Sequence, residues 1–161
     1  MKHYQISKHS GQEDDTWSSI TDIGTDFNGA ILTSEEYLRI ENLYIETIRT
    51  FIYHNSKSFK IKFLMDLRGE DDADKWIFDI DQPLIKVRGG EYLDESSILP
   101  LCKLCLRDLM GIRLQADNGD YITFGCDLYL RLGMSGENDF CLSGLSRQGL
   151  FINVMNNDPD A

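Results

Sequence analysis

The chain has 161 residues, of which 42% are hydrophobic and 27% are charged, and a chain of this length can bury a core without disulfides or metals. Its 27 acidic residues outnumber its 16 basic residues, which gives a formal net charge of −11 at pH 7. Such a field repels nucleic acids and anionic membranes, so it excludes both as direct partners and favours basic proteins or cations.

The N-terminal segment and the apolar runs bear on location. Residues 1–15, MKHYQISKHSGQEDD, contain no apolar core between their charges, which is unlike a signal peptide. No apolar run approaches the ~20 residues that a membrane-spanning helix requires. We therefore expect a cytoplasmic protein in which residues 1–161 form a single domain.

The predicted elements begin with a strand at residues 2–8, where polar and apolar side chains alternate loosely. An ordered loop follows, in which aromatic residues such as Trp17 hold the chain in place. The strongest helix covers residues 33–55, with Thr33 and Glu36 as a capping box. Its apolar side chains recur at spacings of three and four and predict one buried stripe, formed by Tyr37, Leu38, Ile40, Tyr44, Ile45, Ile48, Phe51 and Ile52.

Alternating residues predict three further strands in the middle of the chain. The strand at 58–68 has lysines 60 and 62 on one face and five apolar side chains on the other: Phe59, Ile61, Phe63, Met65 and Leu67. The strand at 75–81 has Asp79 and Asp81 on one face and Trp76, Phe78 and Ile80 on the other. Residues 83–90 predict a short strand that two glycines end.

The second half predicts another helix and more antiparallel sheet. Residues 94–111 indicate a helix with a serine cap, with Pro100 in its first turn and with Gly111 closing it. Asn118 and Gly119 predict a two-residue hairpin turn, and residues 122–132 then predict one long strand. Residues 149–155 predict a last strand, and we expect residues 155–161 to form a frayed tail. The fold class is α+β, a mostly antiparallel sheet with two main helices packed on one face.

The cysteines do not predict a metal site or a catalytic site. Cys102 and Cys105 lie on one apolar helical stripe, and Cys126 lies on the apolar face of its strand, so we expect core packing. A zinc site usually needs two short-spaced pairs of cysteines, and the sequence has only the pair Cys102 and Cys105. There is no nucleophile elbow, P-loop or dinucleotide fingerprint, and the three histidines lie in polar surroundings. We therefore expect no enzyme activity, metal or cofactor.

The segment GEDDADKWIFDIDQ, residues 69–82, gathers six acids and one lysine. It lacks the calcium-loop pattern and the Asp/Glu-x-Lys pattern of magnesium nucleases. A solvated turn is the plain interpretation, and Asp79 and Asp81 also suit cross-strand pairing with lysines 60 and 62. The functional interpretation is a surface for a basic partner, with Tyr92 as its aromatic anchor. The candidate contacts are Glu70, Asp71, Asp72, Asp74, Asp79, Asp81, Glu91, Tyr92, Asp94 and Glu95.

Residues 14–52 carry a resemblance to a known family. The motif TWSSITDIG, a Phe-x-Gly turn and LTSEEYLRIENLYI resemble small bacterial immunity proteins, which are encoded beside polymorphic toxins, including those of contact-dependent growth inhibition systems. The resemblance implies a cytoplasmic protein that binds the C-terminal toxin domain of a neighbour's effector, often a basic nuclease. It implies no catalytic residues.

The expected function is therefore an immunity protein that occludes the active site of a cognate, basic nuclease toxin. Acidic side chains would take the place of the phosphates that such a toxin binds. Two alternatives stay open. An acidic nucleic-acid mimic that regulates a host DNA- or RNA-binding protein shares the charge signature, and a metal-dependent hydrolase would use the carboxylates for turnover.

Overall fold

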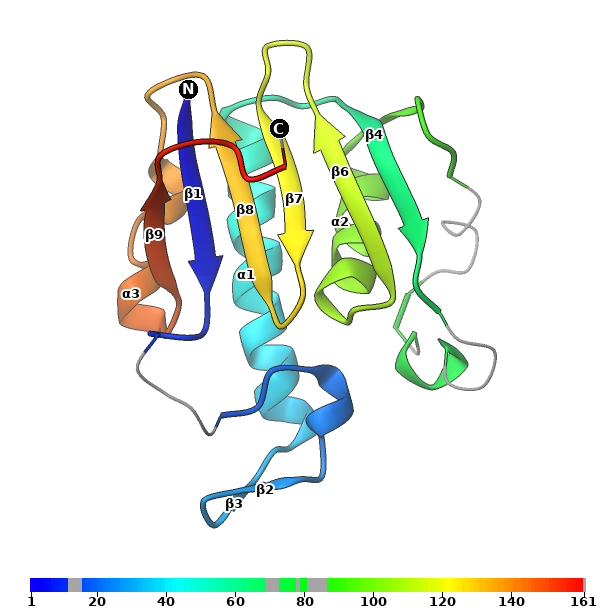
Figure 1. Cartoon of the computed structure of the whole chain (residues 1–161), viewed down its shortest axis with the longest axis vertical. Coiled ribbons are helices and arrows are strands. Elements are labelled where there is room, and N and C mark those ends of the chain that lie inside the picture. The colour runs from blue at the N-terminus through cyan, green and yellow to red at the C-terminus, as the bar shows by residue number, and fades with distance from the viewer. Residues whose placement is uncertain (12–15, 69–72, 78, 81–86, 161) are drawn as a thin grey trace.

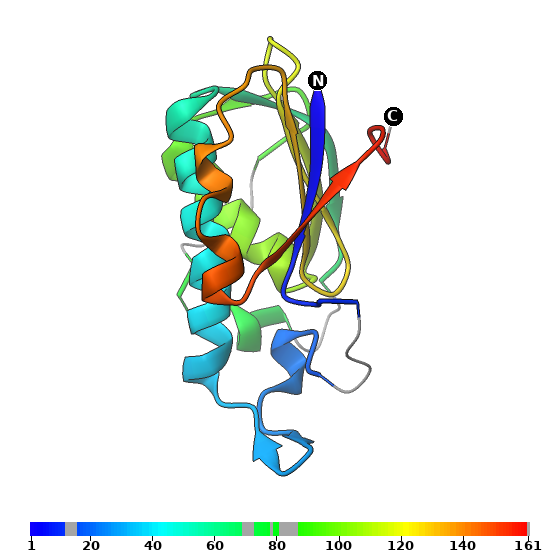
Figure 2. The ribbon, with the colours of Figure 1, turned by 90° about the vertical axis from the view of Figure 1, so that its left-hand side faces the viewer.

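In the computed structural model of the chain, the described residues (1–11, 16–68, 73–77, 79–80 and 87–160) form one seven-stranded antiparallel sheet with helices on one face (Figures 1 and 2). The sheet order is β5-β4-β6-β7-β8-β1-β9. Its strands are β1 (Lys2–Ser7), β4 (Phe59–Asp66), β5 (Tyr92–Leu93), β6 (Met110–Gln115), β7 (Tyr121–Gly125), β8 (Tyr129–Met134) and β9 (Phe151–Met155). The helices are α1 (Ser34–His54), α2 (Glu95–Leu106) and the short α3 (Leu145–Gln148). The predicted α+β class is confirmed.

Smaller elements lie between these. A separate hairpin joins β2 (Asp26–Phe27) and β3 (Ala30–Ile31). The described residues also include the short 3-10 helices η1 (Ile20–Asp22), η2 (Ala73–Trp76) and η4 (Phe140–Leu142). Within the described residues, no helix has both the length and the apolar composition to cross a bilayer.

The long helix α1 forms where the sequence predicts it. The Thr33 side chain accepts a hydrogen bond from the Glu36 backbone N–H at 3.2 Å, which caps the first turn. The reciprocal half of the capping box is replaced, because the Glu36 carboxylate binds Arg39 instead. The predicted stripe faces the core, with all its members buried except the partly buried Leu38. Burial of this stripe is what seats α1 on the sheet.

Strand β4 departs from the predicted alternation after Ile61. Phe59 and Ile61 are buried, but the pairing passes from Ile61 opposite Leu114 to Phe63 opposite Arg113, so Lys62 is an extra residue. This β-bulge reverses the side-chain faces beyond it. Leu64 packs toward the core, whereas Phe63 is exposed. The prediction that the apolar residues of 58–68 share one buried face is wrong beyond the bulge.

Helix α2 is shorter than predicted. Its N-cap is Asp94, which accepts a hydrogen bond from Ser97 N–H at 3.2 Å, rather than a serine, and Pro100 lies inside the helix beyond its first turn. The helix ends at Leu106, and Asp108 has a φ of 56°, a left-handed conformation that stops helical geometry. Gly111 lies in β6 and does not close the helix.

Two turns in the second half of the chain differ from the sequence prediction. Of Asn118 and Gly119, only Gly119 has positive φ, and its N–H bonds to Ala116 O at 3.0 Å, so a type I turn with a bulge replaces the two-residue turn. The predicted long strand at 122–132 is two antiparallel strands, β7 and β8. Asp127 (φ 59°) and Leu128 (φ 64°) reverse the chain between them, which leaves Cys126 exposed.

The segment after β4 and the C-terminal tail also differ from expectation. The described part of the predicted strand 75–81 contains the end of η2 and a turn, with Ile77 and Ile80 in the core. Most of the predicted strand 83–90 lies outside the described residues, and 87–90 are not in a strand. The tail is tied down rather than frayed, because Arg113 forms hydrogen bonds of 3.1 and 2.6 Å with Asp158. Figure 1 shows the tail crossing the sheet from β9 toward β7.

Candidate functional site

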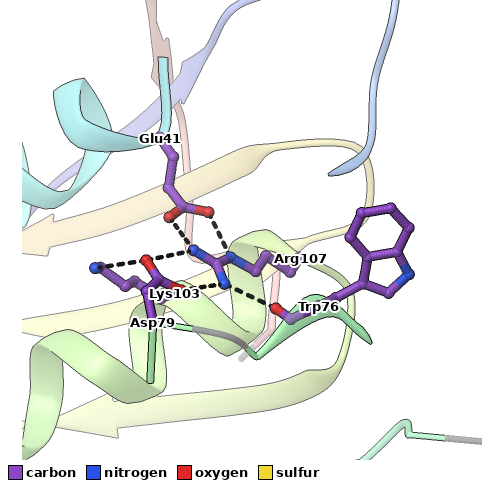
Figure 3. Close-up of polar contacts among 5 residues, drawn as sticks. All are labelled: Glu41, Trp76, Asp79, Lys103 and Arg107. Atoms are coloured by element: carbon purple, nitrogen blue, oxygen red, sulfur yellow. Dashed lines mark hydrogen bonds and ion pairs between the residues drawn. The ribbon is translucent and has the colours of Figure 1, made fainter. Parts of the chain in front are cut away.

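A buried arginine at the end of α2 connects both main helices to the acidic segment (Figure 3). The Arg107 guanidinium donates hydrogen bonds of 2.8 and 2.7 Å to the two carboxylate oxygens of Glu41 on α1. It also donates to Asp79 at 2.7 and 3.1 Å, and to the Trp76 carbonyl oxygen at 2.7 Å. These five bonds equal the five N–H groups of a guanidinium. The arrangement holds the described part of the acidic segment against the helices.

The electrostatics of this network identify Asp79 as a structural residue. The side chains of Arg107 and Glu41 are fully buried, so each charge needs the other. Burial disfavours the charged form of Asp79, but its hydrogen bonds and charge interactions with Arg107 and Lys103 together outweigh this and hold its pKa below the usual value. Lys103 adds a contact of 3.4 Å to the same carboxylate. Asp79 therefore pairs with Arg107 and Lys103, so the predicted cross-strand pairing with lysines 60 and 62 is wrong for Asp79, while Asp81 lies outside the described residues.

Above this network, α1 and α2 border a groove of about 650 Å³ that contains the predicted residues Asp79 and Glu95. Its charges are compensated within the groove. Arg49 pairs with Glu46 and lies 3.5 Å from Glu95. Exposed pairs of this kind contribute about 0–1 kcal/mol and stay accessible to solvent. The groove is a mixed-charge surface, so its carboxylates do not form a purely acidic site.

Three other predicted residues, Glu91, Tyr92 and Asp94, lie in or beside β5. Glu91, Tyr92 and Asp94 are exposed, and the Tyr92 side chain is 55% exposed. The Tyr92 hydroxyl donates a hydrogen bond of 2.9 Å to the carboxylate of Asp117. We call Glu91, Tyr92, Asp94 and Asp117 the Tyr92 surface. The Lys60 ammonium lies 5.6 Å from the centre of the Tyr92 ring.

The Tyr92 surface stays negatively charged at neutral pH. Hydrogen bonds from the Ser96 hydroxyl and the Ser97 N–H hold the pKa of Asp94 below its usual value. Asp117 was missed by the sequence analysis, because the segment QADNGD was interpreted only as a turn. It is 25 residues from Tyr92, and the pairing of β4 with both β5 and β6 brings the two together. An acidic residue at a hairpin tip was the available signal.

The remaining predicted contacts are not placed by the structure. Asp74 lies in η2, and only the backbone of Asp74 is described. Glu70, Asp71, Asp72 and Asp81 lie outside the described residues. The structure therefore brings together Glu91, Tyr92 and Asp94 on one surface, and Asp79 and Glu95 in the helical groove. The two groups adjoin at the start of α2, where Asp94 and Glu95 are neighbours.

The thiols are placed largely as expected. Cys102 and Cys105 are buried in the core, where desolvation raises the pKa of both. Burial also raises the pKa of Cys141 to about 12. The prediction that Cys126 packs on an apolar face is wrong. Among the described residues, no three histidine, cysteine or carboxylate side chains are close enough to hold a metal ion.

Comparison with models of known families, with characterised proteins and with solved structures finds no match to this chain.

Proposed function

We propose that this chain is an immunity protein that captures a cognate basic toxin domain, of nuclease type, and occludes its active site. The observation that carries the proposal is the Tyr92 surface, a half-exposed aromatic ring beside three exposed acidic residues on a chain of net charge −11. Aromatic anchors supply much of the energy of protein interfaces. Complementary charge accelerates encounter with a basic partner.

The partner is assigned as a toxin from the resemblance of residues 14–52 to bacterial immunity proteins. A nuclease binds its substrate phosphates with lysine and arginine side chains, and carboxylates can pair with the same groups. Binding at that surface blocks the substrate without any chemistry by the inhibitor. This mechanism needs only exposed carboxylates and an anchor, both of which the Tyr92 surface has.

The first test is protection. The gene immediately upstream is read first: a secreted effector there supports the proposal, and its absence favours the nucleic-acid-mimic regulator. The chain is then co-expressed with the C-terminal domain of that effector, and growth is measured. We expect the wild-type chain to restore growth, and purified proteins to form a complex whose association rate falls steeply with salt. A toxin that kills in the presence of the folded chain contradicts the proposal.

The second test removes charge from the Tyr92 surface while keeping its hydrogen bonds. The triple variant E91Q/D94N/D117N retains an oxygen that can cap α2 and one that can accept from Tyr92. We expect association to slow by about tenfold at low salt. The matched control is E35Q/E137Q/D139N, which removes three exposed carboxylates elsewhere and should change the rate far less. Equal rates for the two variants would assign the effect to net charge alone.

Two outcomes favour the alternatives. Capture of a host DNA-binding protein, with no protection against the toxin, indicates a nucleic-acid mimic. Turnover by the isolated chain that a single carboxylate substitution abolishes indicates a hydrolase.

A further inference from the structure

The open face of the sheet carries a row of large apolar side chains. The helices α1, α2 and α3 lie on one side of the sheet (Figure 2), and we call the other side the outer face. On β4, Phe63 and Met65 pair with Arg113 and Gly111, which alternate with the buried Leu114 and Ile112 and so belong to the outer face. Phe63 and Met65 are 48% and 46% exposed, and Leu67, which follows the end of β4, is 47% exposed. We call these three residues the β4 stripe.

The β-bulge at Lys62 is what places this stripe outside. In a regular strand, Phe63 and Met65 would continue the buried face of Phe59 and Ile61. The bulge interrupts the regular pairing and turns both side chains away from the core. Their exposure to water is unfavourable, because apolar surface is more stable when buried. Bulges commonly re-aim side chains at functional sites, and clustered exposed apolar side chains mark interaction surfaces. The stripe therefore has the character of a contact surface.

A groove beside Phe63 adds depth to the stripe. It has a volume of about 320 Å³, and Phe63, Gly111, Thr123 and Asp160 are among its lining residues. A Cβ at Gly111 would lie 3.5 Å from the Phe63 ring and 3.7 Å from Met65 Cβ. Because Gly111 has no side chain, the space beside Phe63 and Met65 is open. A partner's apolar side chain can contact the stripe there.

The net charge of the chain selects the partner, since the outer face also carries Lys60, which pairs with Tyr92, and the exposed Lys62 beside the stripe. The two arginines at the centre of the outer face are compensated by the tail, because Arg113 binds Asp158 and Arg131 lies 3.6 Å from Asp160. The stripe is continuous with the Tyr92 surface, since Tyr92 pairs with Lys60 on the same strand. A chain with a net charge of −11 is repelled by a second copy of itself and by an anionic membrane. A basic protein is attracted.

We propose that the β4 stripe is the apolar centre of the toxin-binding surface, with the Tyr92 surface as its charged rim. This inference rests on the proposed function and names the occupant as an apolar patch of the toxin domain flanked by lysine and arginine. The stripe holds the complex together, and the rim accelerates its formation. The two parts are therefore expected to affect different rate constants.

The experiment compares two double variants by surface-immobilised kinetics against the toxin domain. F63T/M65T removes two of the three apolar side chains of the stripe and introduces β-branched residues, which suit a strand. The matched control I31T/V154T alters two other exposed strand residues, which are 62% and 70% exposed. We expect F63T/M65T to dissociate about 100-fold faster or more with a nearly unchanged association rate, and the control to match the wild type within about twofold. Circular dichroism and thermal unfolding verify that each variant is folded.

The outcomes separate the two proposals. If the wild-type chain binds and F63T/M65T dissociates no faster than the control, the stripe inference is overturned and the proposed function stands. If the wild-type chain does not bind the toxin domain, both are overturned. If sedimentation shows a wild-type dimer that F63T/M65T converts to a monomer, the occupant is a second copy and the inference is wrong.

Discussion

The buried pair between Glu41 and Arg107 allows a sharp stability prediction. Replacing Glu41 by glutamine leaves the Arg107 guanidinium buried, with a neutral amide in place of the carboxylate that now accepts bonds of 2.8 and 2.7 Å. Removing one partner of a buried ion pair costs about 3–5 kcal/mol. For a chain of this length each kcal/mol lowers Tm by about 2–4 °C, so the expected decrease is about 6–20 °C.

The assay is urea and thermal unfolding of E41Q, with two comparisons. Glu46→Gln changes an exposed residue of the same helix that pairs with Arg49, and it should alter the free energy of unfolding by less than about 1 kcal/mol. The double variant E41L/R107M removes both charges, and we expect it to be more stable than E41Q, because no buried charge is left without its partner. A loss below about 1 kcal/mol in E41Q, or a double variant that is no more stable than E41Q, would refute the role assigned to the network.

Three further predictions concern other described residues. The buried carboxylate of Asp120 accepts bonds from Asn118, Ser56 and both the N–H and hydroxyl of Ser135. Burial opposes the ionisation of Asp120, but these bonds hold its pKa below the ordinary value of an aspartate. The unfolded chain therefore binds more protons in acid than the folded chain does. The stabilisation by Asp120 is present above the ordinary pKa of an aspartate and is lost as the pH falls through the folded pKa. Acid titration of unfolding should therefore show a smaller loss below about pH 5 in Asp120→Asn than in the wild type. Asp158→Asn should release the tail from Arg113, measured as faster trimming by a carboxypeptidase, and unchanged trimming would contradict the observed tether. Cys126 should react with a thiol reagent in the folded protein while the other three thiols react only on unfolding, and fast reaction of two or more thiols would contradict their burial.

Local patterns predicted the elements that depend on local physics. Helix α1 has a capping threonine and a stripe at helical spacing, and both act within a few residues of each other. The first strand, the last strand and the hairpin around Gly119 also occur where alternation and turn residues place them. The α+β class follows from these elements together.

The errors occur where distant partners decide the geometry. The alternation in β4 predicts a continuous face, but pairing with β6 places an extra residue at Lys62 and reverses it. Residues 122–132 alternate as one strand, yet the left-handed conformations of Asp127 and Leu128 turn the chain back on itself. Asp79 has the parity of a cross-strand partner but binds Arg107, which is 28 residues away. None of these contacts has a local signature.

The candidate site divides in the same way. Composition by itself determined the charge of −11, and the sequence located Glu91, Tyr92 and Asp94, because charge and residue type do not depend on folding. Only the tertiary structure brought Asp117 to Tyr92, paired Asp79 with the buried Arg107 and turned Phe63 and Met65 outward. The physical reason is that burial and ion pairing are set by neighbours across the sheet, and strand pairing chooses those neighbours.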